Sequence, residues 1–105
     1  MNQNKIDFNS LKWETPNKGV KQKILSKGNQ RLRLLRFYDD FTEEDWCLEG
    51  HIGYVTAGEM TIDFNGEMVK YKEGDGLWIE RGEKNKHKAI IEKEKFVELI
   101  LFETV

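Results

Sequence analysis

The amino-acid sequence predicts an all-β domain of the sandwich or barrel type. Short runs rich in Val, Ile, Tyr and Phe recur about every 8–12 residues, and turn residues separate them instead of helical segments. The clearest signal is a strand in which Met60, Ile62 and Phe64 alternate with polar residues. Asn65-Gly66 follows directly, and the alternation then resumes. An Asn-Gly pair between two such runs predicts a tight β-hairpin, because a type I′ turn needs positive φ at both central residues.

Length and composition limit the chain to one domain and exclude several classes of function. The 105 residues leave room for a single core, and 38% hydrophobic residues are enough to build it. The net charge of −2 offers no basic surface for nucleic acid, and no apolar run is long enough for a membrane helix. The first ten residues lack the apolar stretch of a secretory signal, and a single cysteine cannot form an internal disulfide. We therefore expect a cytoplasmic protein with no nucleic-acid or membrane partner.

The first part of the chain predicts an arm that leads into the barrel. Residues 1–22 are polar and show little periodicity, so we expect an arm that lies along the barrel or pairs with a second subunit. A short strand at 23–25 would open the single domain, which then comprises residues 23–105. Residues 31–37 alternate as a strand does, although their Leu and Arg content would also suit a helix.

The rest of the chain predicts short strands joined by turns. The last apolar run could be a buried helix by hydrophobicity alone, but its Val, Ile and Phe content favours a strand. A polar loop is expected at residues 81–86. The predicted strands are 51–56, 59–64, 67–71, 76–79, 88–91 and 96–102, and turns are predicted at 57–58, 73–75 and 92–95.

Residues 45–91 resemble the cupin superfamily in the order of their motifs. His51 and Gly58, with six residues between them, match the end of the first cupin motif, and His51 stands where the family usually has Glu. Counting back from His51 places Asp45 and Cys47 at the two usual histidine positions. The resemblance implies a jelly-roll barrel (a double-stranded β-helix), frequent homodimers and a divalent metal held by the motif residues.

The second cupin motif supplies the other half of the resemblance. It begins at Gly74-Asp75, continues through Gly82 and ends at His87, while Glu80 stands at the usual proline. The predicted Asn-Gly hairpin lies between the two motifs, as it does in the family. His87 therefore occupies the position of the last metal-ligating histidine.

Cys47, His51 and His87 are the predicted metal ligands. His51 and His87 are the only two histidines, and Cys47 lies four residues before His51 with a turn between them. Two imidazoles and a thiolate suit zinc and also resemble mixed sites for iron or nickel, and an open fourth position is typical of a catalytic site. The alternatives are that the cysteine is a small buried residue and that the histidines are only hydrogen-bonded. We expect Asp45 and Glu49 to be solvated loop acids.

Trp78 is the predicted ligand-pocket residue. It falls where cupins often place an aromatic side chain on the barrel wall. The alternative is that Trp78 is a core-packing residue with no further role.

Two functions fit these predictions. The first is a metal-dependent small-molecule enzyme, of isomerase or oxygenase type, in which the metal polarises a carbonyl or hydroxyl group or activates water or dioxygen. The second is a non-catalytic cupin that binds a small ligand or a metal as a sensor or accessory subunit. The absence of a clear general base leaves the second hypothesis open.

Overall fold

The computed structural model describes residues 4–105, which form seven strands and two short 3-10 helices. This confirms the all-β prediction. No helix in the described range is long and apolar enough to cross a membrane. The elements are η1 (Phe8–Ser10), β1 (Val20–Lys27), β2 (Gln30–Tyr38), β3 (His51–Phe64), β4 (Glu67–Lys72), β5 (Gly76–Ile79), η2 (Glu83–Asn85), β6 (Lys88–Ile90) and β7 (Phe96–Thr104).

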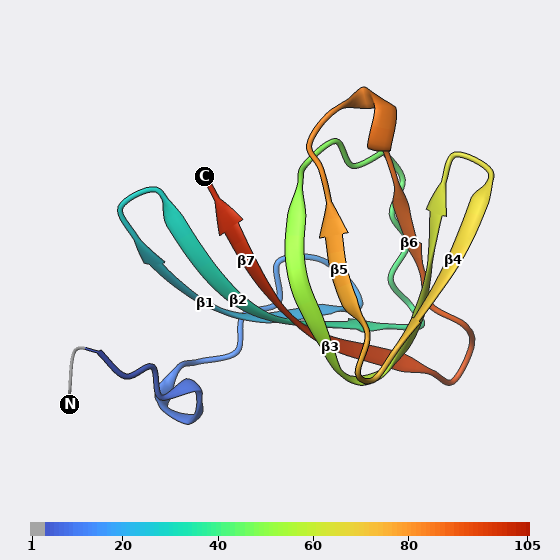
Figure 1. Cartoon of the computed structure of the whole chain (residues 1–105). Coiled ribbons are helices and arrows are strands. Elements are labelled where there is room, and N and C mark those ends of the chain that lie inside the picture. The colour runs from blue at the N-terminus through green and yellow to red at the C-terminus, as the bar shows by residue number, and fades with distance from the viewer. Residues whose placement is uncertain (1–3) are drawn as a thin grey trace.

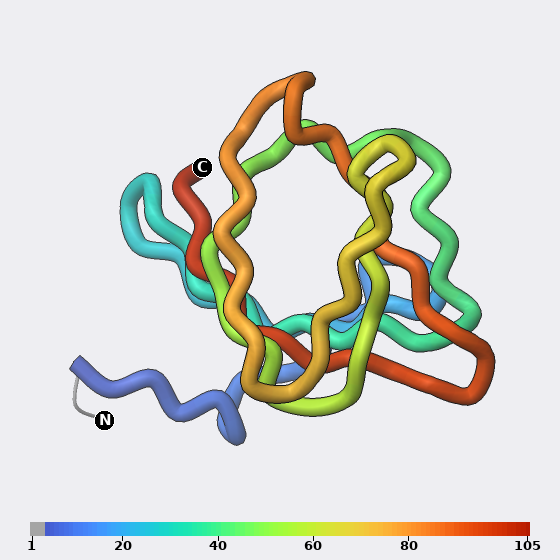
Figure 2. Tube along the Cα trace, turned by 45° about the vertical axis from the view of Figure 1, so that its right-hand side comes forward, coloured from blue at the N-terminus to red at the C-terminus, as the bar shows by residue number. Residues whose placement is uncertain are grey.

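The long strand β3 joins the two sides of the molecule. All strand pairs are antiparallel, and the order β1-β2-β7-β3-β4 runs through β3, which also pairs with β5 and β6. Figure 1 shows β1, β2 and β7 on one side, β4 and β6 on the other, and β3 with β5 between them. In Figure 2 the chain winds around a common interior, as expected for a jelly-roll barrel.

A β-bulge in β3 replaces the turn predicted at residues 57–58. The two predicted strands around that turn are one strand of 14 residues, and its pairing with β7 shifts register between Val55 and Ala57. Gly58 has φ +73°, and a Cβ atom there would collide with the backbone oxygen of Phe96. Ala57-Gly58 therefore marks a bulge and a close approach of β3 to β7, not a chain reversal.

The bulge decides which side chains of β3 face the interior. Side chains of a regular strand alternate between faces, so an odd-numbered and an even-numbered residue would normally point in opposite directions. The extra residue at the bulge reverses this parity, and His51 before it lines the same cavity as Met60 and Ile62 after it. Without the bulge His51 would point away from that cavity.

The predicted Asn-Gly hairpin is confirmed. Phe64 pairs with Glu67 across the turn, and both Asn65 (φ 59°) and Gly66 (φ 109°) have positive φ. The backbone N–H of Gly66 also donates to Asp63 Oδ1 at 2.7 Å. This short connection fixes the register between β3 and β4.

The N-terminal arm is joined to the outside of β1 and β2. Glu14 forms a bridge with Gln22, and Trp13 lies against Lys23 and Arg36, whose charged groups are 4.8 and 4.4 Å from its ring centroid. Strand β1 begins at Val20, so the predicted boundary after residue 22 lies inside this strand. The strand starts earlier because residues 20–22 already pair with residues 35–37 of β2.

The core lies between the two sides of the barrel, where β2, β3, β5 and β7 turn alternate residues inward. Strand β7 follows a regular pattern in which Val97, Leu99 and Leu101 are buried and their neighbours are less so. The full set of buried hydrophobic residues is Val20, Leu35, Val55, Met60, Ile62, Leu77, Ile79, Ile91, Val97, Leu99 and Leu101.

Candidate metal centre

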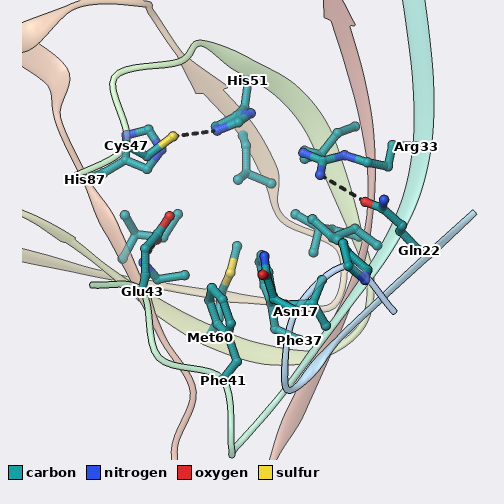
Figure 3. A pocket seen from close by; sticks show the side chains of 18 of the residues that line it. Asn17, Gln22, Arg33, Phe37, Phe41, Glu43, Cys47, His51, Met60 and His87 are labelled. Carbon is teal, nitrogen blue, oxygen red and sulfur yellow. Dashed lines mark hydrogen bonds between the residues drawn. The ribbon is translucent and has the colours of Figure 1, made fainter. Parts of the chain in front are cut away.

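Cys47, His51 and His87 meet at one end of the barrel interior. One potential ligand atom from each residue lies within 4.8 Å of the other two. Cys47 Sγ is 3.6 Å from His51 Nε2, and the ring centroids of His51 and His87 are 5.2 Å apart (Figure 3). The fold thus brings together three side chains that the sequence places up to 40 residues apart.

Backbone pairing holds each of the three residues in place. His51 is the first residue of β3 and pairs with Ile79 of β5. Cys47 and His87 form an antiparallel bridge of their own, with N–H to O distances of 2.8 Å from Cys47 and 3.1 Å from His87. The three donors therefore depend on hydrogen-bonded backbone instead of mobile loops.

The two imidazole rings present the same nitrogen to the centre of the cluster. His87 Nδ1 lies 3.0 Å from the backbone oxygen of Asn85, which can only accept a hydrogen bond, so Nδ1 carries a proton. His51 Nδ1 likewise lies 3.1 Å from Glu103 Oε2. Both rings therefore direct Nε2 toward the cluster, and Nε2 is the nitrogen that a metal would bind after displacing any proton it carries.

Glu103 is a site residue that the sequence analysis missed. Its carboxylate is only 6% exposed and accepts from three neighbours: Arg31 contacts Oε1 at 2.8 Å, while Arg33 (2.8 Å) and His51 (3.1 Å) contact Oε2. A signal was present, because Glu103 has the parity of the buried residues Leu99 and Leu101. An acid on the core face of a strand needs partners.

The cluster shifts the pKa values of its own members. Hydrogen bonds with His51 and His87 lower the pKa of the Cys47 thiol to about 6. Burial lowers the pKa of His51, but hydrogen bonds to Cys47 and Glu103 outweigh burial and raise it to about 9. Burial raises the pKa of Glu103, but the hydrogen bond from His51 and the charges of Arg33 and Arg31 lower it to about 2. At neutral pH the metal-free site therefore holds a thiolate beside an imidazolium.

The cluster lines one end of a cavity of about 340 Å³. Figure 3 shows Cys47, His51 and His87 on one side of this cavity and Met60 and Phe41 on the other. Polar side chains lie near the histidines and also opposite them, at Asn17 and Glu43, and aliphatic and aromatic side chains form most of the remaining lining (Figure 3). The cavity thus combines a few convergent polar groups with a largely apolar surface, as small-molecule sites do.

Trp78 does not belong to this cavity, and the sequence prediction for it is wrong. Strand β5 turns Leu77 and Ile79 inward, so the side chain of Trp78 points outward and is 74% exposed. Leu77 lines the cavity instead. Trp78 pairs with Ile52 on the outer face of the sheet, so it is not a core residue either.

The expectation for the two neighbouring acids agrees with the structure. Asp45 and Glu49 are exposed. Glu49 forms an ion pair with Arg81 at 3.6 Å. Neither acid belongs to the three-residue cluster found among the described residues.

The donor set fits a divalent transition metal. A thiolate and two neutral imidazole nitrogens are a common ligand combination for zinc and also occur with iron or nickel. Three protein donors leave a position for a further ligand. The carboxylate behind His51 and the carbonyl behind His87 are the hydrogen-bond partners that metal-ligating histidines usually have.

The barrel, together with a family match, identifies this protein as a small cupin domain, which confirms the predicted resemblance. More specifically, residues 27–99 match the model of the AraC-like ligand-binding domain, and the chain belongs to that family. A search of curated protein sequences found no match.

Solved structures with low sequence identity share the fold. The polyketide cyclase RemF from Streptomyces resistomycificus has 15% identity and a TM-score of 0.79, covering 93% of this chain and 76% of its own. KdgF from Halomonas sp. has 18% identity and a TM-score of 0.73, covering 92% and 91%. An RmlC-like cupin from Shewanella frigidimarina has 16% identity and a TM-score of 0.71, covering 91% and 85%. These similarities establish the barrel alone.

Proposed function

We propose that this domain binds a small molecule in the barrel cavity with the help of a divalent transition metal held by Cys47, His51 and His87. The observation that carries the proposal is the convergence of Cys47 Sγ and two histidine rings whose Nδ1 atoms are already engaged. The bound metal would act as a Lewis acid toward an oxygen atom of the ligand. Zinc is the first choice because of the thiolate, and iron and nickel remain in the predicted set.

The protein side chains would perform three tasks in ligand binding. Glu103, which pairs with two arginines, would orient His51 and partly neutralise the positive charge of the site. The backbone bridge between Cys47 and His87 fixes the distance between their side chains. The apolar wall, which includes Leu35 and Leu99, excludes water from the body of the ligand.

An enzyme of isomerase or oxygenase type is the second candidate. Glu43 lines the cavity together with the cluster, and its carboxylate is a potential acid or base, although one oxygen already accepts the N–H of Ala89 at 2.7 Å. Cyclase and isomerase names among proteins with this fold are compatible with such a role. The ligand-binding function needs no proton transfer and requires fewer groups.

Metal analysis of protein purified without a histidine tag tests the proposal. We expect about one equivalent of metal after reconstitution, and Cys47→Ser and His87→Ala should each weaken binding at least about 10-fold. Less than about a tenth of an equivalent of any transition metal would refute it. Unchanged occupancy in Cys47→Ser would show that the thiol is only packed.

We place the protein in a reducing compartment, the cytoplasm, which would keep Cys47 available as a ligand.

We further propose a homodimer through the outer face of the sheet formed by β5, β3 and β7. Trp78 pairs with Ile52, and Ile52 pairs with Phe102, so three exposed apolar side chains form a row across these strands. A second copy of the same face would cover this row. Trp78→Glu should lower the mass measured by sedimentation equilibrium to that of a monomer, whereas Met68→Glu, at an exposed position on β4, should not. A monomeric wild type would contradict this proposal.

A further inference from the structure

One nitrogen of Arg33 is buried without an acceptor. Arg33 lines the cavity, donates through Nη2 to Glu103 at 2.8 Å and through Nη1 to Gln22 Oε1 at 3.3 Å. Its Nε has no hydrogen-bond partner among the described residues. A buried donor without an acceptor is costly, so a small shift of the Arg33 side chain that brought Nε within reach of a ligand oxygen in the cavity would be favourable.

The same side of the cavity carries excess positive charge. Arg31 and Arg33 both contact Glu103, so two guanidinium groups share a single carboxylate. Under the proposed function a divalent metal would add two further positive charges, of which the Cys47 thiolate neutralises one. Glu43, which lies across the cavity in Figure 3, is the remaining acid of the lining. The loaded cavity therefore favours an anion.

Apart from Asn17 and Glu43, the side of the cavity opposite the histidines is lined by apolar side chains. Leu35, Leu99, Met60 and Phe41 contribute to this wall. A polyol would have to place hydroxyl groups against these side chains, where they would lose their hydrogen bonds to water. A compact hydrocarbon or aromatic group would instead bury its surface there, and a cavity of about 340 Å³ has the size of a small-molecule site.

We propose that the cavity selects a small organic carboxylate with a compact apolar body. The carboxylate accepts a hydrogen bond from Arg33 Nε and lies on the side of the cavity that holds His51 and Cys47. The apolar body rests against Leu35, Leu99 and Met60. This inference rests on the proposed function to the extent that the metal supplies part of the positive charge.

Three probes separate the contributions of charge and apolar body. Benzoate has both a carboxylate charge and a compact apolar ring. Benzamide has the same ring without the charge, and acetate has the charge without the ring. Titration of zinc-loaded, tag-free protein should show benzoate binding at least about 10-fold more tightly than either of the others, because a charged acceptor bonds about twice as strongly as a neutral one. Benzoate should also shift the NMR resonance of the Arg33 Nε–H group. Equal binding of benzoate and benzamide, or no benzoate binding, would overturn the inference.

A matched pair of arginine variants tests whether Arg33 binds the carboxylate. Arg33→Gln should weaken benzoate binding at least about 10-fold and leave benzamide binding nearly unchanged. Arg36→Gln is the control, because Arg36 lies on the same strand and pairs with a glutamate of β7, Glu98, but faces outward. Benzoate affinity that falls equally in both variants would contradict the assignment.

Failure of this inference can be told apart from failure of the proposed function. If zinc binds and benzoate does not, only the carboxylate inference fails. If zinc does not bind, the proposed function fails, and the benzoate titration is repeated on the metal-free protein. Benzoate binding to the metal-free protein that is lost in Arg33→Gln would support the carboxylate inference. If the metal-free protein shows no such binding, both the carboxylate inference and the proposed function are refuted.

Discussion

His51 and Arg33 hydrogen-bond to the same carboxylate oxygen, Glu103 Oε2, at 3.1 and 2.8 Å. One atom near the end of β7 therefore connects a proposed metal ligand on β3 to a charged side chain on β2. The orientation of the His51 ring depends on this contact, and so does the position of the Arg33 guanidinium in the cavity.

Removing the Glu103 charge should weaken metal binding. Glu103→Gln leaves the two arginines without a counter-ion and weakens the acceptor for His51 Nδ1. We expect zinc affinity to fall about 10-fold or more in chelator competition. The unfolding free energy at pH 7 should fall by about 3 kcal/mol, because one member of a buried ionic group is lost. Glu98→Gln is the control, because Glu98 pairs with Arg36 on the outer face. Equal zinc affinity in Glu103→Gln and wild type would contradict the role of Glu103.

The low pKa of Glu103 predicts how the free energy of unfolding depends on pH. Its pKa is lowered to about 2, so the carboxylate stabilises the fold at pH values above the usual glutamate pKa. This stabilisation is lost as the pH falls from about 5 toward 2, because the unfolded chain binds the proton first. Urea unfolding across this range should show a steeper decline for wild type than for Glu103→Gln. Parallel declines would show that the carboxylate pKa is not depressed by folding.

The fold follows from patterns that are local in the sequence, whereas the details of the site do not. The Asn65-Gly66 hairpin was predictable because the turn requires positive φ at both residues and the flanking alternation sets the register. The turn predicted at Gly58 is wrong, because a glycine at a tight approach to Phe96 gives the same sequence signal as a glycine in a turn. The consequence for His51 could not be foreseen, because a bulge changes which face a side chain occupies.

Some residues around the proposed metal site could be predicted from the sequence and others could not. The resemblance to cupin motifs pointed to Cys47, His51 and His87, and the structure brings these three together. Trp78 was assigned to the interior by motif position, although the alternation of β5 puts Leu77 there. Glu103 lies outside both motifs, and its partners Arg31 and Arg33 come from a strand about 70 residues earlier.

Cys47 should react as a thiolate at unusually low pH. Hydrogen bonds with His51 and His87 lower its pKa to about 6, whereas an ordinary thiol titrates near pH 8.5. Alkylation of the metal-free protein by iodoacetamide should reach half its maximal rate near pH 6. His51→Ala should move this midpoint upward, and Cys47→Ser, the control, should not be labelled. A wild-type midpoint above about pH 8 would show that the thiol lies outside the influence of the histidines.

Gly58→Ala tests the bulge that turns His51 inward. The new methyl group would meet the Phe96 backbone, so we expect a loss of at least about 3 kcal/mol in urea unfolding, as for other severe backbone conflicts. Gly28→Ala is the matched control, because Gly28 also has positive φ but has open space around it. It should cost only about 1 kcal/mol. Equal losses in the two variants would show that the close approach of β3 and β7 is not needed.

Cobalt titration tests the central claim most directly. Co²⁺ replaces zinc in many sites, and its visible and near-ultraviolet absorption reports both low coordination number and thiolate ligation. Tag-free wild-type protein should show an absorption change that saturates at about one equivalent and includes a thiolate charge-transfer band, and the band should be lost in Cys47→Ser. No absorption change on cobalt addition, or a band that persists in Cys47→Ser, would contradict a metal centre at Cys47, His51 and His87.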